Sequence, residues 1–381
     1  MRDLDGIDER LEAHLDGLHV GGADGWRLAC DLFAAHHEDG EAFLLLSLAA
    51  ADPQDARLET ALSLLMPTLS VLESAGAHTL AWLPATSTKR IVQRGLLHAD
   101  PICRRMALRA AFAHGHDPDC VTQQIITSQR YRECLARAIQ AVGELGRVDL
   151  YAACRPHLTS DDIPVRFWTS WTLALRTASG ESRKTLQWFA TARSPFAVAA
   201  AALAARRLAP LDAQAWIDLL ATTHPRLAIQ AAGAAGDPVR LPWLLERCAD
   251  PALARVSGEA ISLITGVDLA YLDLDGDQPA DFTPPGPTDD PADPNVDTDP
   301  DEHLPWPDVA KLSRWLAQQS FPVGVRHLCG KPIEAAWCQQ VLRDGYQRQR
   351  LAAAHELAAI DPTAPLFNTA APAWVQRKLL G

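Results

Sequence analysis

The sequence AIQAVGELG at residues 138–146 returns as AIQAAGAAG at residues 228–236, 90 residues further along the chain. This separation is three periods of 30 residues, and stepping by one period places a small or apolar residue at the fourth position of every unit. Those positions are Ala111, Ala141, Trp171, Ala201, Ala231 and Ile261. Three units end with glycine, at Gly146, Gly236 and Gly266. An internal repeat of this length predicts a repeat architecture in which the fourth position packs against a neighbouring helix.

Each repeat unit is predicted to contain two helices, an alanine-rich first helix and a shorter second helix with leucines at helical spacing. Asp117-Pro118 and Asp237-Pro238 are expected to start second helices. An aspartate carboxylate accepts hydrogen bonds from free helix amides, and proline is tolerated at the first helical position. Because a unit this short cannot bury its own apolar face, neighbouring units must stack. The sequence therefore predicts an all-α fold, an α-solenoid of helical hairpin repeats.

The other parts of the chain lack this period. Residues 1–96 contain several helical patterns, including residues 56–75, and are predicted to form an N-terminal helical cap region. Residues 97–272 hold the repeats. Residues 273–303, here called the acidic segment, carry eleven acidic residues, no basic residue and many prolines, which predicts a linker or loop. Residues 304–381 again show helical patterns and are assigned to a C-terminal helical subdomain.

Several phrases resemble known repeat families. The pattern R-x-x-x-x-A-A-x-x-x-G-x-D-P at residues 105–118 and AIQAAGAAGDP at residues 228–238 resemble HEAT-like repeats of the phycobilisome-lyase type. RFW at 166–168, AISLITGVDL at 260–269 and GYQRQRLAAAHELA at 345–358 resemble an uncharacterised family of bacterial HEAT-like proteins associated with type VI secretion gene clusters.

The resemblance implies a non-enzymatic scaffold that binds a secreted effector, a toxin or its delivery component. Two roles are then open, an immunity protein that neutralises the toxin or an adaptor or chaperone that holds the effector before export. The resemblance brings no catalytic residues with it. A lyase-like or small-ligand-binding HEAT protein is the alternative, and a nucleic-acid-binding scaffold is the third reading.

Charge is distributed unevenly along this chain of net charge −12. Residues 1–85 and the acidic segment are strongly acidic, whereas the remainder carries more basic than acidic residues. The overall acidity disfavours nucleic acid as a partner, because nonspecific affinity for it comes from basic contacts to phosphate. The unequal distribution also motivates the hypothesis that the acidic segment folds back onto the basic part of the repeats and competes with a partner.

Motifs of familiar enzymes are missing from the sequence. It contains no G-x-x-x-x-G-K-[ST] and no G-x-S-x-G. Its eight cysteines form no C-x-x-C pair, which predicts reduced structural thiols. The first 20 residues are too acidic for a signal peptide, and no apolar run approaches the roughly 20 residues of a membrane helix. We therefore expect a cytoplasmic protein with no cofactor and no membrane contact.

Two clusters contain potential metal ligands. The first comprises His114, His116, Asp117, Asp119 and Cys120. Equivalent positions of other repeats hold glycine, arginine or alanine, which favours a solvated turn over a transition-metal site. The acidic segment is dense in oxygen ligands for calcium, but its spacing does not fit an EF-hand loop, since Leu304 stands where the bidentate acid should be. No metal site is assigned.

The candidate protein-binding residues form two groups. The first is a basic lip near the start of the repeats, comprising Lys89, Arg90, Arg94, Arg104, Arg105 and Arg109. The alternative for this group is that several are ordinary exposed helix residues and that Arg105 bonds between repeats. The second is an aromatic stripe on the predicted second helices, which line the concave side of HEAT-like arrays, comprising Trp188, Trp216, Trp243, Arg155 and Arg247. Tryptophan and arginine dominate binding hot spots, although core packing is the competing role of each tryptophan.

Overall fold

The computed structural model describes residues 2–52, 56–117, 121–128, 131–280, 282–288, 292–293, 295, 297–322 and 324–381. Helices account for most of these residues, and the strands within the described ranges are short two-residue segments. The predicted all-α class is confirmed. The chain divides into two compact units, a terminal unit of Met1–Arg176 with Asp361–Gly381 and a central unit of Thr177–Ile360.

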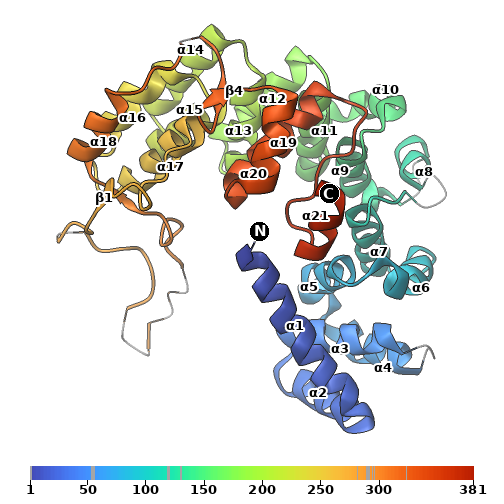
Figure 1. The fold of residues 1–381 in the computed structure, drawn as a ribbon. Helices are drawn as coiled ribbons and strands as arrows, with labels where there is room; N and C mark the ends of the chain where they lie inside the picture. Colours follow the sequence, from blue (N-terminus) through green and yellow to red (C-terminus); the bar gives the residue numbers. More distant parts are fainter. Residues whose placement is uncertain are drawn as a thin grey trace. The chain divides into compact units, whose positions relative to one another are not determined.

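The terminal unit contains the helices from both ends of the chain (Figure 1). Its helices are α1 (Arg2–Val20), α2 (Gly22–His36), α3 (Asp39–Ala51), α4 (Ala56–Leu65), α5 (Leu69–Trp82), α6 (Ala85–Leu96), α7 (Pro101–Ala113), α8 (Val121–Thr127), α9 (Leu135–Leu145), α10 (Tyr151–Cys154), α11 (Ile163–Arg176) and α21 (Ala373–Leu380). Short 3₁₀ segments are η1 (Met66–Thr68), η3 (Arg132–Cys134), η4 (Val148–Leu150) and η5 (Arg155–Thr159).

The central unit contains the later repeats and most of the C-terminal segment (Figure 1). Its helices are α12 (Gly180–Thr191), α13 (Ala197–Arg207), α14 (Pro210–Ala221), α15 (Pro225–Ala235), the 3₁₀ segment η6 (Pro238–Arg240), α16 (Leu241–Arg247), α17 (Ala254–Thr265), α18 (Val309–Leu316), α19 (Ala335–Asp344) and α20 (Gln347–Ile360). Its strands are β1 (Asp275–Gly276), β2 (Trp306–Pro307), β3 (His327–Leu328) and β4 (Lys331–Pro332), paired antiparallel as β1 with β2 and β3 with β4.

Alternate helices pack side by side within each unit. In the terminal unit α3, α5, α7, α9 and α11 follow one another in this way, and in the central unit α13, α15 and α17 do so. The fourth positions of the 30-residue period lie on these helices and are all buried, with exposed fractions of 0 to 6%. The predicted role of this position is therefore confirmed. The alternate packing also includes α3 and α5, which precede the residues where the sequence shows the repeat.

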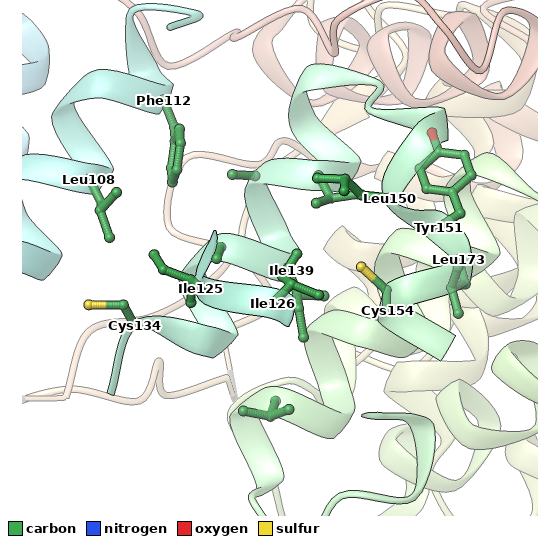
Figure 2. Close-up of a cluster of buried hydrophobic side chains, with 14 of the residues drawn as sticks. Leu108, Phe112, Ile125, Ile126, Cys134, Ile139, Leu150, Tyr151, Cys154 and Leu173 are labelled. Atoms are coloured by element: carbon green, nitrogen blue, oxygen red, sulfur yellow. The ribbon is translucent and has the colours of Figure 1, made fainter. Parts of the chain in front are cut away.

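A buried cluster in the terminal unit joins five helices (Figure 2). Its labelled members come from α7, α8, α9, α10 and α11 and the segments between them, namely Leu108, Phe112, Ile125, Ile126, Cys134, Ile139, Leu150, Tyr151, Cys154 and Leu173. Polar bonds reinforce the contact of α9 with α11, since the Thr172 hydroxyl donates to the Ile139 carbonyl at 2.9 Å. First and second helices thus both contribute side chains to this core.

The ends of several helices have local causes. The Asp237 carboxylate accepts a hydrogen bond from the Val239 amide at 3.1 Å, which confirms the predicted start of a second helix. The Asp117 carboxylate accepts from the Thr122 amide at 3.1 Å, while Pro118 lies outside the described residues. The helical pattern at 56–75 is interrupted by η1, where Pro67 cannot donate the backbone hydrogen bond of a continuous helix.

The three repeat-ending glycines have left-handed backbone conformations, with φ of 66° at Gly146, 74° at Gly236 and 73° at Gly266. Each ends a first helix as its C-cap. A Cβ at Gly146 would lie 2.6 Å from the Thr363 carbonyl oxygen, and one at Gly266 would lie 2.8 Å from the Cys329 carbonyl carbon. The C-terminal part of the chain therefore passes directly over the ends of the repeat helices.

This C-terminal part is divided between the two units and does not form one separate subdomain. Residues up to Ile360 belong to the central unit, where the His327 amide donates to the Gly236 carbonyl at 2.7 Å. Residues from Asp361 onward belong to the terminal unit, where the Ala373 amide donates to the Asp8 carboxylate at 2.6 Å. The two compact units therefore differ from the four consecutive segments expected from the sequence, because hydrogen bonds to residues far away in the sequence hold the C-terminal residues.

Candidate protein-interaction surfaces

The basic lip lies in the terminal unit, and two of its arginines on α7 connect neighbouring elements. Arg105 binds the carboxylate of Glu73 on α5 through both arms of its guanidinium group, with Nε 2.7 Å from Oε1. Arg104 pairs with Glu133, donates to the His98 carbonyl at 2.6 Å and lies 4.9 Å from the centre of the Tyr131 ring. Arg105 thus bonds between successive alternate helices, as the alternative interpretation of this group expected.

The remaining lip arginines also have partners inside the terminal unit. Arg90 donates to the Asp52 carbonyl at 2.8 Å, and Arg94 pairs with Glu59. Arg109 donates to Nε2 of His78 at 2.6 Å, and burial together with this guanidinium lowers the pKa of His78. Lys89 is exposed. Much of the positive charge of this group is therefore used to hold helices together.

The aromatic stripe falls on second helices, as predicted, but its three tryptophans have different environments. Trp188 on α12 is 50% exposed, whereas Trp216 on α14 is only 9% exposed and packs with the buried face of its helix. Trp243 on α16 is half-buried, with the Arg240 guanidinium 5.8 Å from its ring centre. Trp216 is therefore a core residue, and of the three tryptophans Trp188 is the most exposed.

The difference between Trp188 and Trp216 follows from helix geometry. The buried residues Leu186 and Phe189 of α12 recur 27 residues later as Ala213 and Trp216 of α14. Trp188 and Trp216 are instead 28 residues apart, and one residue corresponds to about 100° around an α-helix. Trp216 therefore corresponds to the buried Phe189, and Trp188, one residue earlier, points about 100° away from that buried position.

The two arginines assigned to the stripe lie in different units. Arg155 begins η5 in the terminal unit and is exposed. Arg247 ends α16 in the central unit, where its side chain is 41% exposed and lies 3.8 Å from the Glu246 carboxylate.

An apolar helix face that the sequence reasoning missed lies on α14. Leu211 is 84% exposed and Leu219 is 68% exposed, and the exposed Ala215 lies midway between them. Residues four apart lie on the same side of a helix, so these three form one apolar stripe over two turns. In the sequence, this face is marked by leucine and alanine at positions i, i+4 and i+8 of α14. These positions are offset from the buried residues Ala213, Trp216, Ile217 and Leu220.

A buried ion cluster in the central unit joins α13 to the C-terminal segment. The Glu356 carboxylate, whose side chain is 4% exposed, accepts from Arg206 at 3.1 Å and from Arg326 at 2.5 and 3.2 Å. Burial alone would raise the pKa of Glu356, but the two guanidinium groups hold it below its usual value. Arg207 and Arg326 line an adjacent cavity of about 450 Å³, which also has Val325, Ile333 and Ile360 in its wall.

A second set of ion pairs attaches the acidic segment to the repeats. Asp299 pairs with Arg255 of α17 at 2.7 Å, and Asp301 binds Arg226 of α15 at 2.6 and 2.7 Å. The Arg255 guanidinium also lies 4.6 Å from the ring centre of Trp306. The acidic segment therefore folds back onto basic side chains of the repeats, as the charge distribution had suggested.

The described residues of the candidate metal cluster serve structural contacts. Nε2 of His114 lies 3.0 Å from the Leu80 carbonyl oxygen, and burial lowers the pKa of His114. Asp119 and Cys120 lie outside the described residues. Within the described ranges, no group of three or more His, Cys, Asp or Glu side chains is placed to hold a metal ion.

Burial raises the pKa of the Cys154 thiol to about 12, so this thiol is a poor nucleophile.

Comparisons of the chain with protein-family models, curated proteins and solved structures give no match. In the part of the chain that the structure describes, no helix has both the length and the apolar character required to cross a lipid bilayer. The class that the fold defines is thus an all-α protein built from packed helical repeats.

Proposed function

We propose that this chain is a non-enzymatic scaffold whose repeat helices bind another protein. The observation that carries the proposal is the exposed apolar surface of α12 and α14, formed by Trp188 and by the stripe of Leu211, Ala215 and Leu219. Large exposed apolar residues at helical spacing favour contact with a partner, and tryptophan is enriched in the energetic centres of interfaces.

The partner that we propose is a type VI secretion effector or a component delivered with it. This part of the proposal depends on the resemblance of residues 260–269 and 345–358 to a secretion-associated family. An immunity protein should cover the active site of a toxin with complementary charge, whereas an adaptor should bind a nontoxic delivery region and release it. Both roles are compatible with an exposed apolar surface on a repeat scaffold.

The test is capture of partners from the native cell extract with the tagged protein, followed by expression of the captured protein alone and together with this chain. We expect a stoichiometric protein partner. A partner that is toxic only when expressed alone would support the immunity role, and one that is nontoxic but unstable alone would support the adaptor role. Recovery of no stoichiometric protein partner would contradict the proposal.

Two matched double variants test whether partner capture depends on the exposed apolar surface of α12 and α14. Trp188→Ala/Leu219→Ala removes two exposed apolar side chains of the central unit and should abolish capture, because hot-spot side chains each contribute about 2 kcal/mol or more. Val71→Ala/Leu97→Ala removes exposed side chains of the terminal unit, which are 80% and 87% exposed, and should leave capture unchanged. Equal capture by both double variants would place the interface elsewhere.

The cavity beside Glu356 favours a second candidate function, the binding of a small polar ligand. Arg207 and Arg326 provide guanidinium groups at its wall, Glu334 and Glu356 provide carboxylates, and its volume of about 450 Å³ is suitable for a small molecule. Native mass spectrometry and an absorption spectrum of the purified protein test this candidate. A bound small molecule that is lost in Arg207→Gln would favour this candidate. A nucleic-acid scaffold would instead require affinity for oligonucleotides at low salt.

A further inference from the structure

The two arginines beneath the acidic segment come from adjacent alternate helices. Arg226 lies in the first turn of α15 and Arg255 in the first turn of α17. Arg105 of α7 precedes Arg255 by five 30-residue periods, and it pairs with Glu73 on the preceding alternate helix, α5. The alternate helix before α17 is α15, and it carries a second arginine, Arg226, which pairs with the acidic segment. This edge of the central unit therefore presents two positive charges, and carboxylates from outside the repeats neutralise them.

The acidic segment meets these arginines with carboxylates two residues apart. Asp299 contacts α17 and Asp301 contacts α15, so one short stretch of chain bridges both helices. Residues 299–302 form a turn, in which the Glu302 amide donates to the Asp299 carbonyl at 3.2 Å and the Asp301 amide donates to the Asp299 carboxylate at 2.9 Å. This turn brings the two carboxylates within reach of arginines on neighbouring helices. Both carboxylates are nearly buried, with side chains 8% and 4% exposed. The arrangement is therefore the geometry of a bound acidic peptide.

A like charge lies near the attached carboxylates. Burial raises the pKa of Glu259 on α17, the charge of Arg348 opposes this rise, and the negative charge of Asp301 adds to it. The two ends of the segment meet at the two-residue strands β1 and β2, where Asp275 pairs with Pro307 and Gly276 with Trp306. Within the segment, the Asn295 side chain donates to the Gly286 carbonyl at 2.8 Å. A tether of this kind keeps the carboxylates at high local concentration and still allows a competing ligand to displace them.

We propose that the face formed by Arg226 and Arg255 is a binding site for an acidic peptide turn of the partner protein, and that residues 299–302 occupy this site in cis until the partner displaces them. The inference rests on the proposed function, since it supplies the chemistry by which the partner is recognised. The partner's peptide carries two carboxylates two residues apart, in the manner of Asp299 and Asp301. Displacement exposes the two guanidinium groups to bidentate pairing with those carboxylates.

The test uses the full chain and a fluorescent peptide with the sequence of residues 295–304 as the probe. Neutralising the occupant in Asp299→Asn/Asp301→Asn should raise affinity for the probe at least about tenfold over wild type, because the site is no longer filled in cis. The matched control Asp277→Asn/Asp297→Asn removes the same charge from exposed positions of the segment and should bind the probe as wild type does. Circular dichroism shows whether the variants keep their helical content.

A second variant tests the site itself. Adding Arg226→Gln to Asp299→Asn/Asp301→Asn should lower affinity for the probe about tenfold, and Arg226 is 36% exposed, so its loss leaves the fold intact. Equal binding of the probe to wild type and all variants, or binding to none, would overturn the inference. Displacement of the probe by an oligonucleotide but not by excess unlabelled peptide would overturn it too and assign the face to nucleic acid.

Partner capture separates this inference from the proposed function. A partner recovered equally by wild type and by Asp299→Asn/Asp301→Asn would leave the scaffold function standing and contradict competition by the acidic segment. Stronger recovery by the neutralised variant supports both. Binding of the probe to the neutralised variant without any protein partner in the extract would support displacement in cis and contradict the proposed function.

Discussion

The replacement Glu356→Gln should be among the most destabilising conservative changes in the central unit. The side chain is 4% exposed and its two oxygens accept hydrogen bonds from Arg206 and Arg326. Glutamine keeps the shape but removes the charge, which leaves the guanidinium group of Arg206, whose side chain is 8% exposed, without a counter-ion. Breaking a buried ion pair on one side costs about 3–5 kcal/mol. Because Arg326 is 23% exposed and can be solvated, we expect a loss of about 3 kcal/mol.

Urea unfolding followed by circular dichroism and tryptophan fluorescence measures this loss, with the two units allowed separate transitions. The control is Glu246→Gln, whose partner Arg247 lies 3.8 Å away and whose side chain is 69% exposed, so that its loss should be below about 1 kcal/mol. The pKa of Glu356 is below its usual value, so the advantage of wild type should be present at neutral pH and disappear as pH falls through the folded-state pKa. A loss no larger than that of the control, or one independent of acid pH, would refute the reasoning.

Three further outcomes are expected. Gly236→Ala should destabilise the chain by more than about 1 kcal/mol in urea unfolding, because φ is 74° and the new Cβ meets the His327 carbonyl, whereas Gly17→Ala, with open space around it on α1, should stabilise by about 0.5–1 kcal/mol. Trp216→Ala should cost about 3–5 kcal/mol by the same measurement, and a cost below about 1 kcal/mol would contradict its core position. The lowered pKa of His78 means that the folded state favours the neutral ring that accepts from Arg109, so stability should be full above pH 6.5 and decline below it, and His78→Gln should flatten that decline in melts at pH 5 and pH 7.5.

The local features of the repeats were predictable because they depend on residues close together in the sequence. The 30-residue period placed six small or apolar residues at buried positions on successive alternate helices. Asp237 caps its helix as its side-chain chemistry requires. Pro67 shows the limit of periodicity, since the apolar spacing of residues 56–75 continues across it while the backbone does not.

The surface of the second helices was less predictable. Trp188, Trp216 and Trp243 are 28 and 27 residues apart, and this similar spacing suggested one continuous stripe. A shift of one residue against the buried set separates Trp188 from Trp216. The number of residues between two tryptophans indicates on which helix each one lies. The exposure of a side chain depends on its angle around the helix axis, and that angle changes by about 100° per residue. The same reasoning identifies the exposed face of α14 only after its buried face is known.

The all-α class, the helical repeat and its buried position follow from local sequence patterns, because helix formation and amphipathic spacing depend on residues close together in the chain. The pairing of distant charges depends instead on how the helices pack. Arg206 and Glu356 are 150 residues apart, and Asp299 and Asp301 reach back to helices that begin tens of residues earlier. Such pairs form when helix ends are brought together by burial of the apolar faces, and any acidic residue within reach can then neutralise an arginine. The path of the C-terminal segment over the repeat glycines has the same origin, since backbone hydrogen bonds carry no sequence signature.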